Sequence, residues 1–160
     1  MTKPRVAFFS FTSCEGCQLV VLTIEEQLLD LLDLIDIVTF REAISEKSEE
    51  YDIAFVEGSI TRESEIERLK TIRDTASIVI ALGACATIGG VNCMKNQYEM
   101  KSVQKIVYGE MADNFDTIPA RPIEEVVKVD YHIHGCPIDR EEFVEVTKSL
   151  LLGKKPRIPD

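Results

Sequence analysis

Short apolar runs alternate along the chain with longer segments in which apolar and charged residues are mixed. Runs of four to eight apolar, often β-branched residues between polar breaks are typical of strands. They predict five strands, over Arg5–Phe11, Ile35–Phe40, Ile53–Val56, Ser77–Leu82 and Val126–Ile133. The fourth run is apolar almost throughout, as expected for a strand that is buried on both faces of a sheet.

The longer mixed segments predict helices over Gln18–Asp33, Glu63–Thr75 and Asp139–Leu151. In the second of these, Ile66, Leu69 and Ile72 share one face, and Asp139 is placed to cap the third. The first carries apolar residues over more than one stripe, so part of its surface is expected to face a partner. Three segments are expected to be less regular: Glu42–Glu50 as a loop or short helix, Gly83–Gly90 as a glycine-punctuated loop, and Gly153–Asp160 as an exposed end. Tyr98–Gly109 is compatible with a helix.

Strands that alternate with helices indicate βαβ units and therefore a mostly parallel sheet. With 160 residues, the chain has the length of one ordinary domain. We therefore expect residues 1–160 to form a single flavodoxin-like domain. Its fold class is α/β, a doubly wound, mostly parallel five-stranded sheet with helices on both faces.

The net charge of −10 changes the range of expected partners. An acidic surface is repelled by nucleic-acid phosphates and by anionic lipid, so neither is an expected partner. Because no window approaches 18 uncharged apolar residues, no direct membrane insertion is expected. The apolar run Val6–Phe9 is too short for a secretory signal, so the expected location is cytoplasmic. Thiols stay reduced in that compartment and remain free to bind metal.

Four of the five cysteines follow predicted strands. Cys14 and Cys17 come after the first strand, Cys85 after the fourth and Cys136 after the fifth. In an open parallel sheet, ligands bind beyond the carboxyl ends of the strands, so these segments are expected to meet at one edge. Glycines beside the cysteines, among them Gly83 and Gly135, suit tight turns and backbone N–H groups that approach sulfur. The sequence therefore predicts a thiolate metal site.

Four thiolates suit either a tetrahedral zinc ion or an iron–sulfur cluster. Zinc sites usually draw on two close-spaced cysteine pairs, whereas here only Cys14 and Cys17 are close in sequence, which favours a cluster. A CxxC pair alone also fits a thiol-redox motif, but that interpretation leaves Cys85 and Cys136 unexplained. A zinc-stabilised structural module and a thiol-redox module therefore remain as alternatives.

The same segments resemble the small subunit of nickel–iron hydrogenases and the related cluster-bearing, 20 kDa-type subunit of complex I. The family pattern is CxGC after the first strand, GxCAxxGG after the fourth and GCP after the fifth. This chain has them as Cys14–Cys17, Gly83–Gly90 and Gly135–Pro137, and Val56–Ile60 resembles the end of the family's third strand. The likeness extends from about Val6 to Arg140 with the motifs in order.

The resemblance implies that Cys14, Cys17, Cys85 and Cys136 hold one 4Fe–4S cluster, the proximal cluster of a hydrogenase. It implies that the nickel–iron centre belongs to a separate large subunit, whose ligands come from two CxxC pairs that this chain lacks. Electrons would pass to further iron–sulfur or flavin subunits. Because 24 residues follow Cys136 and only Cys93 is left over, we expect an abbreviated, cytoplasmic type of subunit with no second cluster. The chain alone is not expected to be catalytic.

Two departures from the family pattern are His134 and Ile138, at positions where proline is common, and neither is a ligand position. Complex I-type subunits have adjacent cysteines where this chain has the spaced pair Cys14 and Cys17, which points to the hydrogenase side. A complex I-like or membrane-hydrogenase subunit with the same cluster is the alternative within this superfamily.

For several other residues near the expected site, a functional role is weighed against a structural one. Glu57 either tunes the cluster or moves protons, or it caps Ser59 and neighbouring backbone groups. Glu15 is expected to face solvent or a partner. Cys93 is expected to be an ordinary buried or half-exposed thiol, and the alternative is that it replaces Cys85 as a ligand or modifies the cluster. His132 and His134 alternate along the fifth strand and so share a face, and a structural role is favoured for them. The acidic stretches Glu46–Glu50 and Glu63–Glu67 are most simply solvated surfaces.

Overall fold

The computed structural model describes residues 3–24 and 26–156, apart from the side chain of residue 26. Five parallel strands form its main sheet in the order β2-β1-β3-β5-β7. They are β1 (Arg5–Ser10), β2 (Asp36–Phe40), β3 (Ile53–Glu57), β5 (Ile78–Leu82) and β7 (Tyr131–Ile133). Numbered within this sheet alone the order is 2-1-3-4-5, that of flavodoxin-like doubly wound folds, so the predicted fold class is confirmed.

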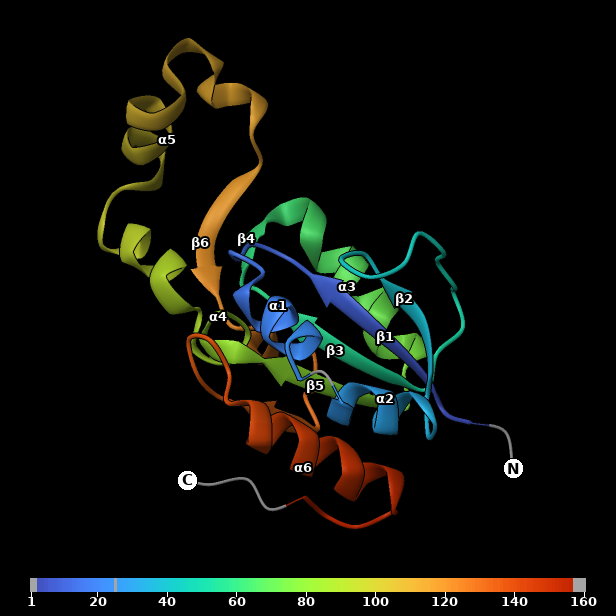
Figure 1. Ribbon diagram of the computed structural model, residues 1–160. Helices are drawn as coiled ribbons and strands as arrows, with labels where there is room; N and C mark the ends of the chain where they lie inside the picture. The colour runs from blue at the N-terminus through green and yellow to red at the C-terminus, as the bar shows by residue number, and fades with distance from the viewer. Residues whose placement is uncertain (1–2, 25, 157–160) are drawn as a thin grey trace.

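Helices cover both faces of the sheet (Figure 1). On one face, α1 (Gly16–Leu22), α2 (Glu26–Leu32) and α6 (Arg140–Leu151) pack over an aromatic core of Phe8, Phe40, Phe55 and Phe143. On the other face, α3 (Glu63–Thr75) packs with Leu69 and Ile72 against a layer that contains Ala7, Ala54 and Ala81. Small residues at this face let the helix approach the sheet closely.

Two predicted helices agree well with the structure. The helix α3 spans Glu63–Thr75, and Leu69 and Ile72 are buried on its inner face as predicted. The helix α6 begins after Asp139, whose carboxylate accepts the backbone N–H groups of Glu141 and Glu142 at 2.9 Å each. The compatible segment Tyr98–Gly109 contains α5 (Met100–Tyr108), and residues 42–50 contain no helix.

The single helix predicted over Gln18–Asp33 is wrong, because the chain forms α1 and α2 there. Residue 25, which falls inside the predicted helix, lies outside the described residues. After α1 the backbone forms a tight turn. The backbone N–H and the side-chain hydroxyl of Thr23 both donate to the Val20 carbonyl, at 3.0 and 2.8 Å. Such a local bond competes with the helical ladder. The apolar pattern continues through the break and so does not reveal it.

Two further expectations need correction. Gly83–Gly90, expected to be a loop, contains the short helix α4 (Gly83–Ile88), with Gly83 at its start and Gly89 as a left-handed C-cap at φ 82°. Glycine at such a C-terminal position is common. Of the strand predicted over Val126–Ile133, only Tyr131–Ile133 pairs in the sheet. Val127 and Val129 are buried in the core layer that also contains Leu69 and Ile72 of α3, without strand pairing.

The chain also forms a second, antiparallel sheet that the sequence pattern does not predict. It pairs β4 (Ile60–Arg62) with β6 (Thr117–Arg121). Three 3-10 helices lie close to β6 in the sequence: η1 (Gly90–Gln97), η2 (Gly109–Asn114) and η3 (Ile123–Glu125). In the tail expected to be exposed, Pro156 is buried, and residues 157–160 lie outside the described residues. None of the described helices is both long and apolar enough to cross a membrane.

Candidate metal centre

The three cysteine segments meet at the carboxyl edge of the main sheet. Since β1, β5 and β7 run parallel within four neighbouring strands, their ends point to the same side. Cys14 and Cys17 lie between β1 and α1 and at the start of α1, Cys85 lies in α4, and Cys136 follows β7. All five cysteines are free thiols.

Direct contacts tie the three segments together around Cys17. Its sulfur lies against Gly83, so close that a Cβ on that glycine would be 2.3 Å from Sγ. The backbone of Ile138, two residues beyond Cys136, lies near enough to the same thiol to act against the rise of its pKa. The N–H of Ala84 donates to the carbonyl of Gly135 at 2.7 Å. Gly83 therefore lies where the backbone approaches the Cys17 sulfur. Gly135 lies where the loop that carries Cys136 meets the start of α4.

Glu57, at the end of β3, holds the start of α1. Its side chain is 2% exposed, and its two oxygens accept the backbone N–H groups of Cys17 and Gln18 at 3.1 Å each. The first N–H groups of a helix have no partner within the helix, and a carboxylate is a favourable acceptor for them. Of the two interpretations of Glu57, the geometry provides direct contacts for capping, at Cys17 and Gln18 and not at Ser59.

The thiols differ in exposure and in their electrostatic surroundings. Cys17 is buried, and burial, followed by the charge of Glu57, raises the pKa of its thiol to about 12. Burial also raises the pKa of Cys85, and charges at Cys136 and Cys14 add to that effect. The last two thiols are exposed and lie near enough to Cys85 to act on it. Cys85 therefore interacts electrostatically with the buried Cys17 thiol as well as with the two exposed thiols.

Cys93 also acts on Cys85 through its charge, but less strongly than Cys136 and Cys14 do. It is half-buried, and its Sγ lies 3.3 Å from the carbonyl oxygen of Ala120 in β6 and 3.8 Å from that of Ile88. A Cβ at Gly89 would be 2.1 Å from that sulfur. The thiol is packed under the second sheet, in keeping with the expectation of an ordinary half-buried thiol.

Glu15 and the two histidines make contacts within the chain. Glu15 has a left-handed backbone at φ 60°, accepts the Ser10 hydroxyl at 2.7 Å and pairs with Arg41. The Ser10 hydrogen bond, followed by Arg41, outweighs burial and lowers the pKa of this carboxyl. Glu15 thus faces its own chain as well as solvent. His132 lies 3.1 Å from a carboxylate oxygen of Glu124, and the exposed His134 stacks on it at a centroid distance of 6.1 Å.

Gln18 is a site residue that the sequence analysis missed. It follows Cys17 in α1 and is 2% exposed, yet its side-chain nitrogen Nε2 has no hydrogen-bond partner in the described part of the chain. A buried amide without a partner costs free energy, so such groups are usually satisfied. The available signal was one polar residue placed between Cys17 and the apolar run Leu19–Leu22.

The chemistry of the donor set tests which metal group the residues fit. Within residues 3–24 and 26–156, no three His, Cys, Asp or Glu side chains are close enough together to hold a single metal ion. Cys14 and Cys136 instead lie near enough to Cys85 to raise its pKa, and Gly83, which has no side chain, lies against the Cys17 sulfur. A cluster keeps its thiolates farther apart than one ion does, and its sulfurs accept N–H hydrogen bonds. The donor set therefore fits an iron–sulfur cluster.

Fold and site together define a doubly wound α/β protein with a thiol-rich centre at the carboxyl edge of its sheet. A comparison with family models matches residues 14–150 to the family described as NADH ubiquinone oxidoreductase, 20 Kd subunit. The match covers more than half of the chain, and the chain belongs to this family. The resemblance to hydrogenase small subunits and the 20 kDa-type subunit of complex I is thus confirmed.

Named relatives carry hydrogenase descriptions. The chain is 35% identical to sulfhydrogenase 2 subunit delta of Pyrococcus furiosus over 98% of its own length and 65% of that protein. It is 33% identical to NAD-reducing hydrogenase HoxS subunit delta of Cupriavidus necator, over 98% of this chain and 83% of the relative. The chain thus spans slightly less than two thirds of the Pyrococcus furiosus protein.

A solved structure extends the likeness to three dimensions. A chain of an NAD+-reducing [NiFe]-hydrogenase in the H2-reduced state superimposes with a TM-score of 0.88 at 29% identity. The superposition covers 99% of this chain and 96% of the other. It therefore includes the second sheet and the helices η1, α5 and η2.

Proposed function

We propose that the chain is the electron-transfer small subunit of a cytoplasmic nickel–iron hydrogenase complex. In this proposal residues 1–160 act as one unit and carry one 4Fe–4S cluster, the proximal cluster. The observation that supports it best is the meeting of Cys14, Cys17, Cys85 and Cys136 at one sheet edge, in a chain whose relatives carry hydrogenase names. When bound, such a cluster accepts and releases single electrons.

The chain's own residues hold and shape that site. Glu57 orients the first turn of α1 through the N–H groups of Cys17 and Gln18. Gly83 leaves the space that the Cys17 sulfur needs, and Gln18 supplies a buried N–H donor. The raised pKa of Cys17 describes the free thiol, which metal coordination deprotonates. Burial and N–H donors near sulfur set how easily a cluster is reduced.

In this proposal the partners of the chain are the other subunits of the hydrogenase complex. The nickel–iron centre is assigned to a separate large subunit, and further iron–sulfur or flavin subunits receive the electrons. The chain alone should therefore not activate hydrogen.

Metal and sulfide analysis of the anaerobically purified chain, combined with EPR of the reduced sample, tests the cluster. We expect about four iron and four sulfide per chain. Replacing Cys85 by Ser should abolish the signal, whereas Cys93→Ser should leave it, because Cys93 packs under β6. A colourless, zinc-loaded protein would contradict the proposal and favour the structural module. Loss of the signal in Cys93→Ser alone would overturn the ligand set.

The family description favours one second candidate, a complex I-like or membrane-hydrogenase subunit with the same cluster. The partner tells the two apart. Purification of the complex from its natural source should yield a nickel-containing large subunit together with this chain. A nickel-free large subunit isolated with membrane subunits would favour the second candidate.

A further inference from the structure

A helical arm projects from the second sheet, and its apolar residues are left uncovered. The arm comprises residues 90–121, that is η1, α5, η2 and β6, and stands away from the main sheet at the upper left of Figure 1. The helix α5 buries none of its residues. A helix of nine residues is marginal in isolation, and amphipathic helices gain most of their stability from packing. Its apolar side is therefore open to a partner.

The base of the arm is well fixed on the body. Asn92 donates from Nδ2 to the carbonyl of Thr12 at 2.9 Å and lies 2.8 Å from the Ser59 hydroxyl. Within the arm, Asn96 of η1 exchanges two hydrogen bonds with the backbone of Ala120 in β6, at 2.6 and 2.7 Å, and β6 pairs with β4 of the body. These bonds hold the arm in a defined direction relative to the cysteine edge, since Thr12 lies two residues before Cys14.

Exposed apolar side chains run from the cysteine site to the tip of the arm. At the base, Ile88 is 66% exposed in α4, the helix that carries Cys85, and Val91 and Met94 are exposed in η1. At the tip, Ile106 is 84% exposed, and Val107 and Met111 are also exposed. The helix that carries Cys85 and the arm that follows it in the chain therefore both expose apolar side chains.

The charge of the same segment is unlike that of the whole chain. Residues 83–114 contain three lysines and three acidic residues, so they are neutral within a chain of net charge −10. Interface centres are depleted of charge and enriched in large apolar residues, whereas solvated surfaces keep their charge. The arm thus has the composition of a surface that is covered in the assembled protein.

We propose that the arm is a docking surface for the nickel–iron large subunit. The inference rests on the proposed function. Electron transfer needs the large subunit directly over the cysteine edge. From Ile88, in the helix that carries Cys85, exposed apolar side chains follow along the chain through Val91 and Met94 to Ile106 and Val107. The likeness to an NAD+-reducing hydrogenase chain covers the arm as well. A large subunit seated over the cysteines extends along the arm and buries these side chains.

The test uses the full chain, tagged and co-expressed with its own large subunit. The double variant Ile106→Glu, Val107→Glu should reduce the co-purified large subunit about tenfold or more, because burying charge at an apolar contact weakens binding. The reduced-state EPR signal of the chain should stay unchanged. The control is Leu152→Glu, which charges an apolar position that is 69% exposed at the end of α6, outside the segment Gln18–Asp33 that is expected to face a partner.

A photo-crosslinking residue at position 107 of the otherwise unchanged chain provides a second measurement that does not depend on a charged variant. It should form an adduct with the large subunit. Wild-type amounts of large subunit on the double variant, with no adduct, overturn the docking proposal. So does an adduct with a second copy of this chain, or with a downstream iron–sulfur or flavin subunit. If the unaltered chain carries neither iron nor a nickel-containing partner, the proposed function itself fails.

Discussion

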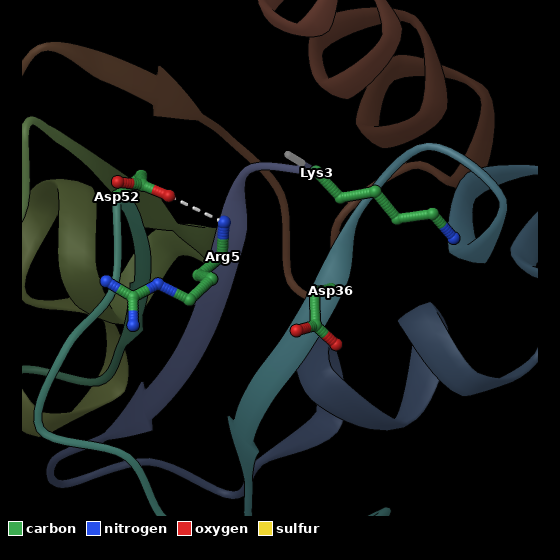
Figure 2. A pocket seen from close by; sticks show the side chains of 4 residues that line it. All are labelled: Lys3, Arg5, Asp36 and Asp52. Carbon is green, nitrogen blue, oxygen red and sulfur yellow. Dashed lines mark hydrogen bonds between the residues drawn. The ribbon is translucent and has the colours of Figure 1, made fainter. Parts of the chain in front are cut away.

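At the amino edge of the main sheet, carboxylates that accept backbone N–H groups lie beside arginines. At the carboxyl edge the equivalent carboxylate, Glu57, forms no ion pair within the part of the chain that the structure describes. Asp52 accepts the N–H of Arg5 at 2.7 Å in a polar pocket that Lys3 and Asp36 also line (Figure 2). Asp130 accepts the N–H of Val79 at 2.9 Å and pairs with Arg73 at 2.5 Å.

Glu57 performs the same task at the carboxyl edge while fully buried, and no cation forms an ion pair with it in the described residues. Beside it lie the unpartnered amide of Gln18 and the buried thiol of Cys17. The amino edge is thus complete within the chain, but the carboxyl edge leaves buried polar groups open. Such groups concentrate at functional sites, where a cofactor or partner completes them.

The largest effect is expected from Gly83→Ala. Its new Cβ would lie 2.3 Å from the Cys17 sulfur, and the backbone φ of +81° is unfavourable for alanine. Strain and overlap together should lower the free energy of unfolding by about 2–5 kcal/mol, measured by urea denaturation. Gly109→Ala is the control, since its φ is +57° with nothing within 4 Å, and it should cost about 1–2 kcal/mol. Equal losses of unfolding free energy in the two variants would contradict the close packing of Gly83 against Cys17.

Glu57→Gln should have the next largest effect. The amide keeps one oxygen acceptor and turns an NH2 group toward a buried backbone N–H, which should lower the free energy of unfolding by about 2–3 kcal/mol. Asp139→Asn makes the same chemical change at an exposed cap that also accepts two N–H groups. It should stay within about 0.5 kcal/mol, because Asn caps helices as well as Asp does. Similar losses of unfolding free energy for Glu57→Gln and Asp139→Asn would contradict the expectation that the buried carboxylate contributes more than the exposed one.

The smallest effect is expected at the amino edge, from Asp130→Asn. Burial acts to raise the pKa of Asp130, but the Val79 N–H and then Arg73 outweigh it, so the pKa is lowered. A lowered folded-state pKa means that the ionised carboxylate stabilises the fold above about pH 4. This contribution is lost as the pH falls through the folded-state value. The side chain is one fifth exposed, so we expect about 1 kcal/mol at pH 7.

Unfolding measured between pH 7 and pH 2 checks this expectation. The difference between the wild-type chain and Asp130→Asn should shrink on acidification and vanish at the lowest pH. Asp36→Asn removes an exposed carboxylate at the same edge and serves as the control. A difference that grows toward low pH would contradict the sign of the shift.

Much of the fold was predictable from local sequence patterns. The alternation of strands and helices predicted a parallel sheet, and α3 has the predicted bounds because its apolar positions follow one helical face. The meeting of Cys14, Cys17, Cys85 and Cys136 at one edge follows from a general rule: parallel strands end on the same side. The sequence by itself therefore determined the fold class and the location of the candidate centre.

Tertiary structure decided the features that depend on distant partners. The break between α1 and α2 lies inside a continuous apolar pattern, and β6 pairs with β4 more than fifty residues earlier in the chain. Glu57 reaches the N–H groups of α1 from forty residues away, and Gln18 is buried without a partner. The arm has apolar residues like those of the core but buries few of them. A local pattern records which residues are apolar, whereas only the assembled chain determines what covers them.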